Sequence, residues 1–225
     1  MDIFDIIGPV MVGPSSSHTA GAVRIGYIAR KLMGEPIEKA EILLGGSFLT
    51  TGKGHGTDKS IVAGLLGMLP DDIQIPDSFE MAKEKGIEVT FGKLDLKDAH
   101  PNTVKLCLTG ESGVNLEIVA SSLGGGRIKV NQIDGITANF CGDYPTLVVR
   151  NQDTPGCVAK ITSLLSFCGV NIATMQLYRN NRGGDAVSII ECDQEIDLNS
   201  INWLRQQKDI IKVTYLSLAD DKGGI

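Results

Sequence analysis

The sequence contains no apolar run that approaches the roughly 20 residues needed by a membrane-spanning helix. Its first eight residues carry two aspartates and lack the basic start of a secretory signal, so we expect a cytoplasmic protein with no membrane partner. The five cysteines are widely spaced and form no C-x-x-C pair, which is typical of reduced thiols rather than a disulfide framework or a metal site. Cys107 and Cys192 lie in apolar runs and are expected to fill the core.

An excess of positive charge is also missing, because the formal net charge is −6 and acidic residues outnumber basic ones on both sides of Tyr144. Binding to a phosphate backbone needs clustered lysine and arginine, so we expect no nucleic-acid partner. The sequence has no G-x-G-x-x-G, G-x-x-x-x-G-K-[ST], H-E-x-x-H or G-x-S-x-G motif. No lysine stands in a context that marks a Schiff base with pyridoxal phosphate.

The run GPSSSHT at residues 13–19 places hydroxyls and an imidazole directly before a helical apolar pattern. Gly13 and Pro14 favour a turn, and serine or threonine oxygens accept hydrogen bonds from amides of the first helical turn. The remaining amides attract a carboxylate or phosphate. The positive helix end disfavours an imidazolium, so His18 is expected to be neutral and able to accept a proton. A serine-rich helix cap with an incidental histidine is the alternative.

A second histidine, His55, lies between two glycines on an expected loop over residues 51–56, which enters a helix predicted over 57–68. Backbone can approach a ligand closely at glycine. Two histidine-bearing junctions between loop and helix predict a shared pocket, and an exposed loop histidine is the alternative. Asp58 lies in the first turn of the second helix, where it could simply cap that helix. His100 precedes a proline on a polar connector and is predicted to be a surface residue.

The first part of the chain predicts helices followed by short strands. Apolar residues at helical spacing after His18 indicate a helix that Gly34 and Pro36 close. A strand is expected over residues 40–48 and a short polar helix over 77–85. Alternating runs predict further strands at 87–93, 103–110, 114–122, 127–133 and 136–140. This order favours an antiparallel sheet with helices on one side, the α+β class.

The pattern changes after Pro145, and the rest of the chain reads strand, helix, strand, strand, helix, strand. This βαββαβ order is the ferredoxin-like unit. We therefore expect two domains, at residues 1–143 and 146–219. Lone units of this kind usually pair through sheets or edges, so homodimerisation through the second domain is expected.

Three consecutive glycines at 124–126, after Ser121 and Ser122, lie between two predicted strands. Their amides could cradle an anion, or they could form a hairpin turn. Arg24 and Lys53 could each counter a carboxylate, and both could equally be solvated.

These motifs resemble a known family. GPSSSHT at 13–19, GHGTD at 54–58, SSLGGGRI at 121–128 and the NQDTPG turn at 151–156 are similar to those of the beta chain of the bacterial iron-sulfur L-serine dehydratase. The likeness spans essentially the whole chain, and GPSSSHT is its most specific part. The C-terminal βαββαβ unit resembles an ACT domain, a module that senses amino acids. The first domain resembles one found in some phosphoglycerate dehydrogenases.

The resemblance implies deamination of L-serine to pyruvate and ammonia. In that family a [4Fe-4S] cluster on an alpha chain acts as a Lewis acid on the leaving hydroxyl, while a base removes the α-proton. This sequence lacks the grouped cysteines of a cluster, so no metal is expected in this chain. Single-chain members fuse both parts, whereas this chain stops after the ACT-like unit. We therefore expect an alpha-chain partner.

The resemblance also implies roles for particular residues. His18 and His55 are the candidates for proton transfer and substrate orientation, with His55 preferred as the base. Asp58 would orient His55. The substrate carboxylate or the surroundings of the cluster would be held by Ser15, Ser16, Ser17 and Thr19.

In the ACT-like domain the resemblance places an amino-acid crevice at Asn151, Asp153, Gly156 and Asn171. Ligand binding and simple dimerisation are equally open for this domain. The main alternative for the whole chain is a non-catalytic regulatory subunit that senses an amino acid, with both histidines structural. A complete metal-free hydratase is disfavoured, because a β-hydroxyl leaves poorly without an electrophile.

Overall fold

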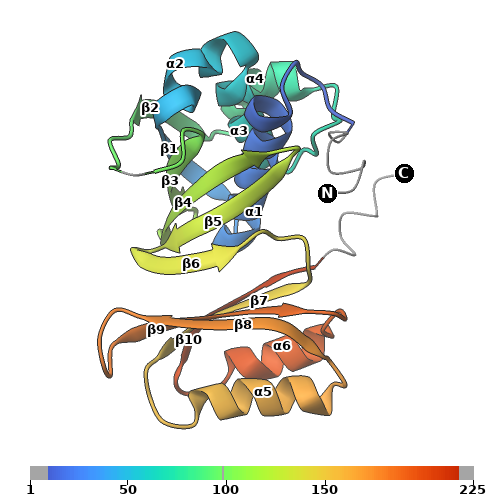
Figure 1. Ribbon diagram of the computed structural model, residues 1–225, viewed down its shortest axis with the longest axis vertical. Coiled ribbons are helices and arrows are strands. Elements are labelled where there is room, and N and C mark those ends of the chain that lie inside the picture. The colour runs from blue at the N-terminus through green and yellow to red at the C-terminus, as the bar shows by residue number, and fades with distance from the viewer. Residues whose placement is uncertain (1–9, 98, 218–225) are drawn as a thin grey trace. The chain divides into compact units, whose positions relative to one another are not determined.

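The computed structural model describes residues 10–97 and 99–217 (Figure 1). The amphipathic segment noted at residues 1–8 lies outside them. The chain divides into two compact units, one ending at Gly135 and the other beginning at Ile136. This division falls earlier than the domain end expected at residue 143. None of the described helices is long and apolar enough to cross a membrane.

The first unit begins with a π-helical turn, Ser16–Ala20, that continues into α1. As predicted, α1 ends where Gly34 adopts a left-handed conformation with φ 74°. The short helix expected at 77–85 is confirmed as α4. The helices of this unit are α1 (Gly21–Met33), α2 (Gly46–His55), α3 (Thr57–Leu66) and α4 (Ser78–Glu84), with a 3-10 turn at Ile75–Asp77.

The region before α3 corrects the sequence prediction. The strand expected over 40–48 ends at Leu44, and the expected loop over 51–56 is instead the second half of α2. Glycines at positions 52, 54 and 56 suggested a loop because glycine weakens a helix interior. The helix forms because tertiary contacts on Phe48 and Gly52, both buried, outweigh that propensity.

Helices α1 and α3 cross at a glycine contact. A Cβ on Gly26 would lie 2.2 Å from the carbonyl oxygen of Ile61, and a Cβ on Gly64 would lie 2.0 Å from that of Val23. Only glycine allows two backbones to approach this closely. Because His18 precedes α1 and His55 precedes α3, this crossing sets the separation of the two motifs.

A sheet with the strand order β2-β1-β3-β4-β5-β6 carries these helices. Helix α1 packs on β4 and β5 (Figure 1). Along β3, Leu106 and Leu108 are buried while Lys105 and Cys107 are only partly so, which is the pattern of a sheet covered on one face. The strands are β1 (Ile37–Leu44), β2 (Glu88–Lys93), β3 (Thr103–Gly110), β4 (Asn115–Gly124), β5 (Arg127–Ile133) and β6 (Ile136–Phe140).

One strand pair departs from the expected antiparallel sheet. β1 and β2 run parallel, with Ala40 opposite Val89, whereas β1 and β3 run antiparallel. The chain returns to β2 through three helices, and such a crossover brings a strand back in the same direction. The sheet is therefore mixed, and the α+β class is confirmed.

From β7 onward the second unit has the predicted βαββαβ order and an antiparallel sheet of order β10-β7-β9-β8. Its core includes Leu147, Ile161, Leu165, Ile190 and Leu204, all buried between the sheet and the two helices. The ferredoxin-like fold is confirmed. Its elements are β7 (Thr146–Gln152), α5 (Cys157–Phe167), β8 (Ile172–Arg179), β9 (Asp185–Cys192), α6 (Leu198–Arg205) and β10 (Ile210–Leu216).

Candidate functional site

His18 lies in the π-helical turn before α1, a helix type that is rare and occurs frequently at functional sites. Ser15 caps this turn, and its Oγ accepts a hydrogen bond from the His18 amide at 3.2 Å. The same Oγ lies 3.4 Å from His18 Nδ1. The predicted serine cap is thus present, and it also contacts the imidazole.

Helix α2 supplies the groups around the other ring nitrogen. His18 Nε2 lies 3.2 Å from Ser47 Oγ and 3.1 Å from Thr51 Oγ1. The buried Phe48 ring packs edge-on against the imidazole, with 5.3 Å between ring centroids. Hydroxyls therefore flank both nitrogens of His18.

His55 is the last residue of α2, and its ring centroid lies 5.0 Å from that of His18. Gly56, with φ 68°, turns the chain directly into α3. The His55 side chain is exposed and has no hydrogen-bond partner among the described residues. The two histidines thus share one site, as the sequence predicted, although His55 sits on a helix end rather than on a loop.

The electrostatic environment of His18 favours its neutral form. Burial lowers the pKa of His18 most, and the neighbouring His55 lowers it further. Neutral His18 agrees with the prediction, but the cause differs from the helix end that was invoked. A ring between α2 and the π-helical turn loses water, and loss of water disfavours a charge.

The remaining residues of GPSSSHT face different surroundings. Ser17 lies near Gly124, because a Cβ on that glycine would be 3.7 Å from Ser17 Oγ. The Ser16 carbonyl accepts the Gly21 amide. Thr19 is buried, and its Oγ1 has no hydrogen-bond partner within the described residues. The buried hydroxyls of Thr57 and Ser122 also have no hydrogen-bond partner within the described residues.

Asp58 does not contact His55 as implied. Its Oδ1 accepts the Lys59 amide at 2.9 Å, in the first turn of α3. No hydrogen bond joins Asp58 to His55 in the described part of the chain. The local role in α3, which the sequence left open, is the one present in the structure.

The three glycines at 124–126 form the turn between β4 and β5, and all three have positive φ. Arg24 Nη1 donates to the Gly126 carbonyl at 3.2 Å, which ties α1 to this turn. The turn approaches Ser17 of the GPSSSHT segment. Nearby, β4 approaches the start of α1, where a Cβ on Gly21 would lie 2.1 Å from Ser122 Oγ. The hairpin interpretation is confirmed, and the third motif lies beside the first.

The sequence analysis missed Ser47, Thr51 and Phe48. A strand was expected at Ser47 and Phe48 and a loop at Thr51, so nothing placed Ser47 and Thr51 on a common face. In a helix, Ser47 and Thr51 are four residues apart and share a face. That spacing was the available signal.

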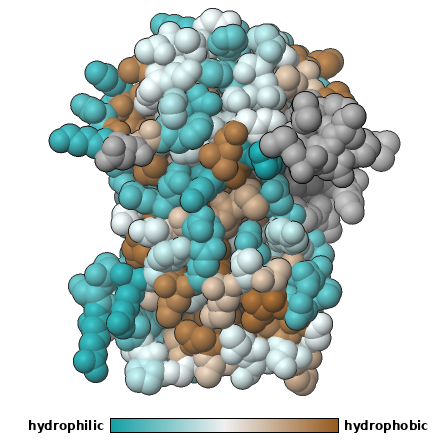
Figure 2. Space-filling model, in the orientation of Figure 1, coloured by the Kyte–Doolittle hydropathy of each residue, from teal (hydrophilic) through white to brown (hydrophobic). Residues whose placement is uncertain are grey.

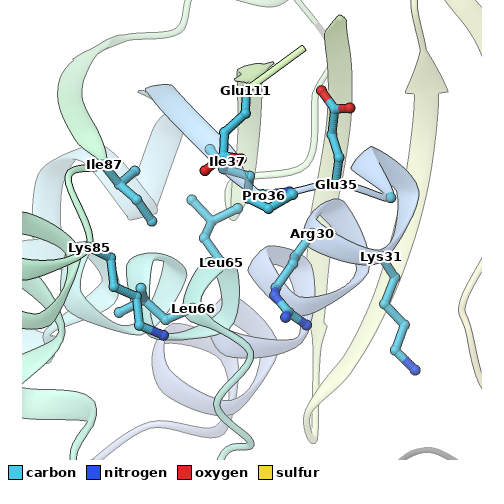
Figure 3. A pocket seen from close by; sticks show the side chains of 11 residues that line it. Arg30, Lys31, Glu35, Pro36, Ile37, Leu65, Leu66, Lys85, Ile87 and Glu111 are labelled. Atoms are coloured by element: carbon cyan, nitrogen blue, oxygen red, sulfur yellow. The ribbon is translucent and has the colours of Figure 1, made fainter.

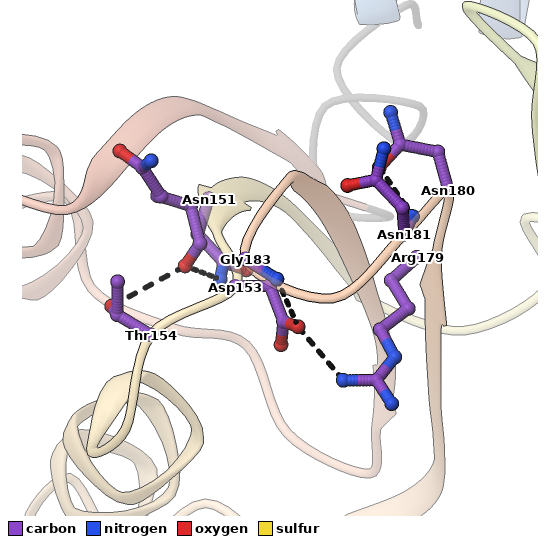
Figure 4. Close-up of polar contacts among 8 residues, drawn as sticks. Asn151, Asp153, Thr154, Arg179, Asn180, Asn181 and Gly183 are labelled. Carbon is purple, nitrogen blue, oxygen red and sulfur yellow. Dashed lines mark hydrogen bonds and ion pairs between the residues drawn. The ribbon is translucent and has the colours of Figure 1, made fainter.

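In the second unit, the residues after β7 are tied mainly to one another (Figure 4). Asp153 Oδ2 accepts from Arg179 Nη1 at 2.8 Å and from the Gly183 amide at 3.1 Å. The Gly183 amide, followed by Arg179, holds the pKa of Asp153 below its usual range. Asn151 is buried, donates to the Gln152 carbonyl and leaves its Oδ1 without a partner within the described residues.

Asn171 does not join this group. It precedes β8, whereas Arg179 ends β8 beside the end of β7. Asn171 Nδ2 donates to Asp193 at 2.5 Å and its amide donates to Gln194. The structure therefore brings Asn151, Asp153 and Gly156 to one end of the sheet and places Asn171 at the other.

Other concave surfaces carry mixed charge. A cleft of about 540 Å³ lies at the C-terminal ends of α1 and α3. Arg30 and Lys85 lie on one side of it, with Glu35 and Glu111 on the other (Figure 3). Helix C-termini carry partial negative charge, so basic side chains are favourable there without any ligand. His100 is exposed, as predicted.

Metal-binding side chains do not cluster in the described residues, where no three of His, Cys, Asp or Glu come together. The five cysteines are free, and two of them, Cys157 and Cys192, are buried. Burial raises the pKa of Cys192 to about 11, which keeps it a thiol. An iron-sulfur cluster does not fit these residues.

The family model described as serine dehydratase beta chain matches residues 1–87. A probable L-serine dehydratase beta chain from Bacillus subtilis (strain 168) is 40% identical, over 96% of this chain and 97% of that protein. The L-serine dehydratase beta chain of Peptoniphilus asaccharolyticus is 38% identical, over 86% of this chain and 87% of that protein.

Among solved structures, the ACT domain of GTP pyrophosphokinase from Chlorobium tepidum is 20% identical over 32% of this chain and 95% of that one, with a TM-score of 0.27.

Proposed function

The chain belongs to the family of L-serine dehydratase beta chains, and from this premise we propose that it provides the proton-transfer half of a cytoplasmic L-serine dehydratase. The reaction removes the α-proton and the β-hydroxyl of L-serine as water. The resulting aminoacrylate rearranges to an imine, which water converts to pyruvate and ammonia.

The observation that carries the proposal is the pair of imidazoles, 5.0 Å apart between ring centroids, with only one of them engaged by hydroxyls. His55 is exposed and without a hydrogen-bond partner in the described part of the chain, so its ring can reach a substrate proton. A histidine base is suited to neutral pH because its pKa lies near that value. We assign His55 as the base and His18 as the residue that orients it.

The substrate carboxylate is assigned to the GPSSSHT segment. Ser15, Ser16 and Ser17 are only partly buried and lie in or beside the π-helical turn. Hydroxyls and amides at a helix start bind carboxylates well. Thr19 is buried beside them, and its Oγ1 has no hydrogen-bond partner within the described residues.

The leaving hydroxyl needs an electrophile that the described residues do not offer. We assign it to an alpha chain with a [4Fe-4S] cluster, which would supply Lewis acidity to that hydroxyl when bound. The name "beta chain", carried by both relatives, supports a partner of this kind.

The second unit is proposed to form a homodimer. β8 is an edge strand of the sheet, and an unpaired edge is a site where another strand can add. Asn151 and Gly156 are proposed as an amino-acid contact. Asp153 is not, because Arg179 and Gly183 already occupy its carboxylate.

The test is His55→Ala in the chain reconstituted anaerobically with its alpha chain. Loss of the base should lower turnover of L-serine by about 10²–10⁴-fold. His100→Ala, which changes an exposed histidine away from the site, is the matched control and should keep full activity. The isolated chain should release no pyruvate.

A contrary result would identify the alternative function. Full turnover in His55→Ala, with only an altered response to added serine, would mean that this chain is a regulatory subunit that senses an amino acid.

A further inference from the structure

We propose that Thr51 and Ser47 are positioning residues that hold His18 as a neutral imidazole with its proton on Nε2. This inference deepens the proposed function and rests on it for the catalytic consequence only. The tautomer itself follows from the hydrogen-bond network and can be measured without activity.

The proton of Thr51 determines the direction of the network. Thr51 Oγ1 donates to the Ser47 carbonyl at 2.9 Å, one helical turn earlier. A hydroxyl has a single proton, so Thr51 Oγ1 faces His18 Nε2, 3.1 Å away, as an acceptor. Nε2 must then carry the hydrogen. Ser47 Oγ lies 3.2 Å from Thr51 Oγ1 and can donate to its second lone pair.

The opposite nitrogen is consistent with the same tautomer. Ser15 Oγ accepts from the His18 amide, and its own proton remains available for Nδ1 at 3.4 Å. A neutral imidazole has one N–H and one acceptor nitrogen, which matches these partners.

The neighbours of His18 add no charge that would favour an imidazolium. The described groups that contact its ring are Ser15, Ser47, Thr51, Phe48 and His55, and none of them is a carboxylate. Two imidazolium rings 5.0 Å apart would repel each other. A neutral His18 therefore adds no charge that would oppose the transfer of a substrate proton to the neighbouring ring of His55.

The experiment compares Thr51→Val with Thr50→Val in the full chain labelled with ¹⁵N at histidine. Thr50 makes the equivalent bond, from its Oγ1 to the Gly46 carbonyl, but does not contact His18, so it is the matched control. His18→Gln assigns the signal. We expect the Nε2–H tautomer in the wild type and in Thr50→Val. Thr51→Val should populate the Nδ1–H tautomer, and Thr51→Ser should restore the wild-type spectrum.

A wild-type Nδ1–H tautomer, or a Thr51→Val spectrum identical to wild type, would overturn the proposal. In the reconstituted enzyme, Thr51→Val should lower kcat about tenfold, the size of one lost hydrogen bond, with little change in KM. Should the spectra behave as expected while His55→Ala keeps full turnover, the proposed function fails and the tautomer assignment stands.

Discussion

The candidate sites of the two units differ in how far their polar side chains satisfy one another. In the first unit His55 has no hydrogen-bond partner among the described residues, and the hydroxyls of Thr19, Thr57 and Ser122 are buried without one. In the second unit Asp153, Arg179 and Gly183 are joined in one cluster, and the buried atoms without a partner within the described residues are Asn151 Oδ1 and Ser188 Oγ. Unsatisfied buried groups cost stability and are expected mainly where function retains them. The proposal of a catalytic site in the first unit agrees with the partnerless His55, and the Asp153 cluster is of the kind that stabilises a loop.

The two units also differ in the large apolar side chains that their helices expose. The helices of the second unit expose Phe167 and Leu198, with 91% and 70% of their surfaces accessible. Figure 2 shows apolar residues among polar ones on one face of the molecule. No equally exposed pair lies on α1 or α3 of the first unit, whose most exposed large apolar residues, Val10 and Ile73, lie outside its helices at 83% and 82%. A role in association for the second unit agrees with this distribution.

The largest expected effect is a loss of stability when the crossing of α1 and α3, next to the first site, is disrupted. Gly64→Ala would place a Cβ 2.0 Å from the Val23 carbonyl, and we expect a loss of about 3 kcal/mol in unfolding free energy. Denaturant unfolding followed by circular dichroism measures it. The control is Gly54→Ala, at a helical glycine with no atom within 4 Å, which should be slightly stabilising. Equal effects of the two substitutions would contradict the role of the crossing.

A smaller effect is expected on the stability of the second unit when the pH is lowered. Because the folded pKa of Asp153 is lowered, its contribution to stability is full above the unfolded value of about 3.9 and is lost as pH falls through the folded value. Wild type should therefore lose more stability than Asp153→Asn on acidification below about pH 4. The single tryptophan, Trp203, lies in α6 and reports unfolding of this unit by fluorescence. Parallel pH profiles of wild type and Asp153→Asn would show that the contact between Asp153 and Arg179 does not stabilise the folded state.

The smallest effect concerns His18. Its pKa is lowered by burial and by His55, so stability is full above the unfolded value of about 6.5 and declines as pH falls from there towards the folded value. His18→Gln should flatten that decline, whereas His100→Gln should not. Thermal melts between about pH 7 and 5 measure the difference. An unchanged slope in His18→Gln would mean that the charged form is tolerated in the fold.

Several elements could be predicted from the sequence because their signals are local. The serine cap at Ser15, the end of α1 at Gly34 and the hairpin turn at 124–126 depend on residues a few positions apart. The βαββαβ order of the second unit followed from alternating and helical apolar periods. The prediction that His18 and His55 share a site came from two local patterns and is met at 5.0 Å.

The errors arose where contacts distant in sequence outweigh local preference. Glycine-rich α2 was expected to be a loop, and its burial at Phe48 and Gly52 makes it a helix. The parallel pairing of β1 and β2 depends on the path of the chain through three helices. Asn171 was placed with Asp153, but strand register puts it at the opposite end of the sheet.

The sequence alone determined which residues are the candidates for the chemistry, because GPSSSHT and GHGTD place imidazoles and hydroxyls at helix ends through bonds spanning only a few residues. Only the tertiary structure decided how they meet. The close contact of Gly26 and Gly64 determines how α1 and α3 lie against each other. His18 lies just before α1, and it contacts Ser47 and Thr51 of α2, the helix that leads into α3. Those distances depend on packing between segments about 30 residues apart, which no local pattern encodes.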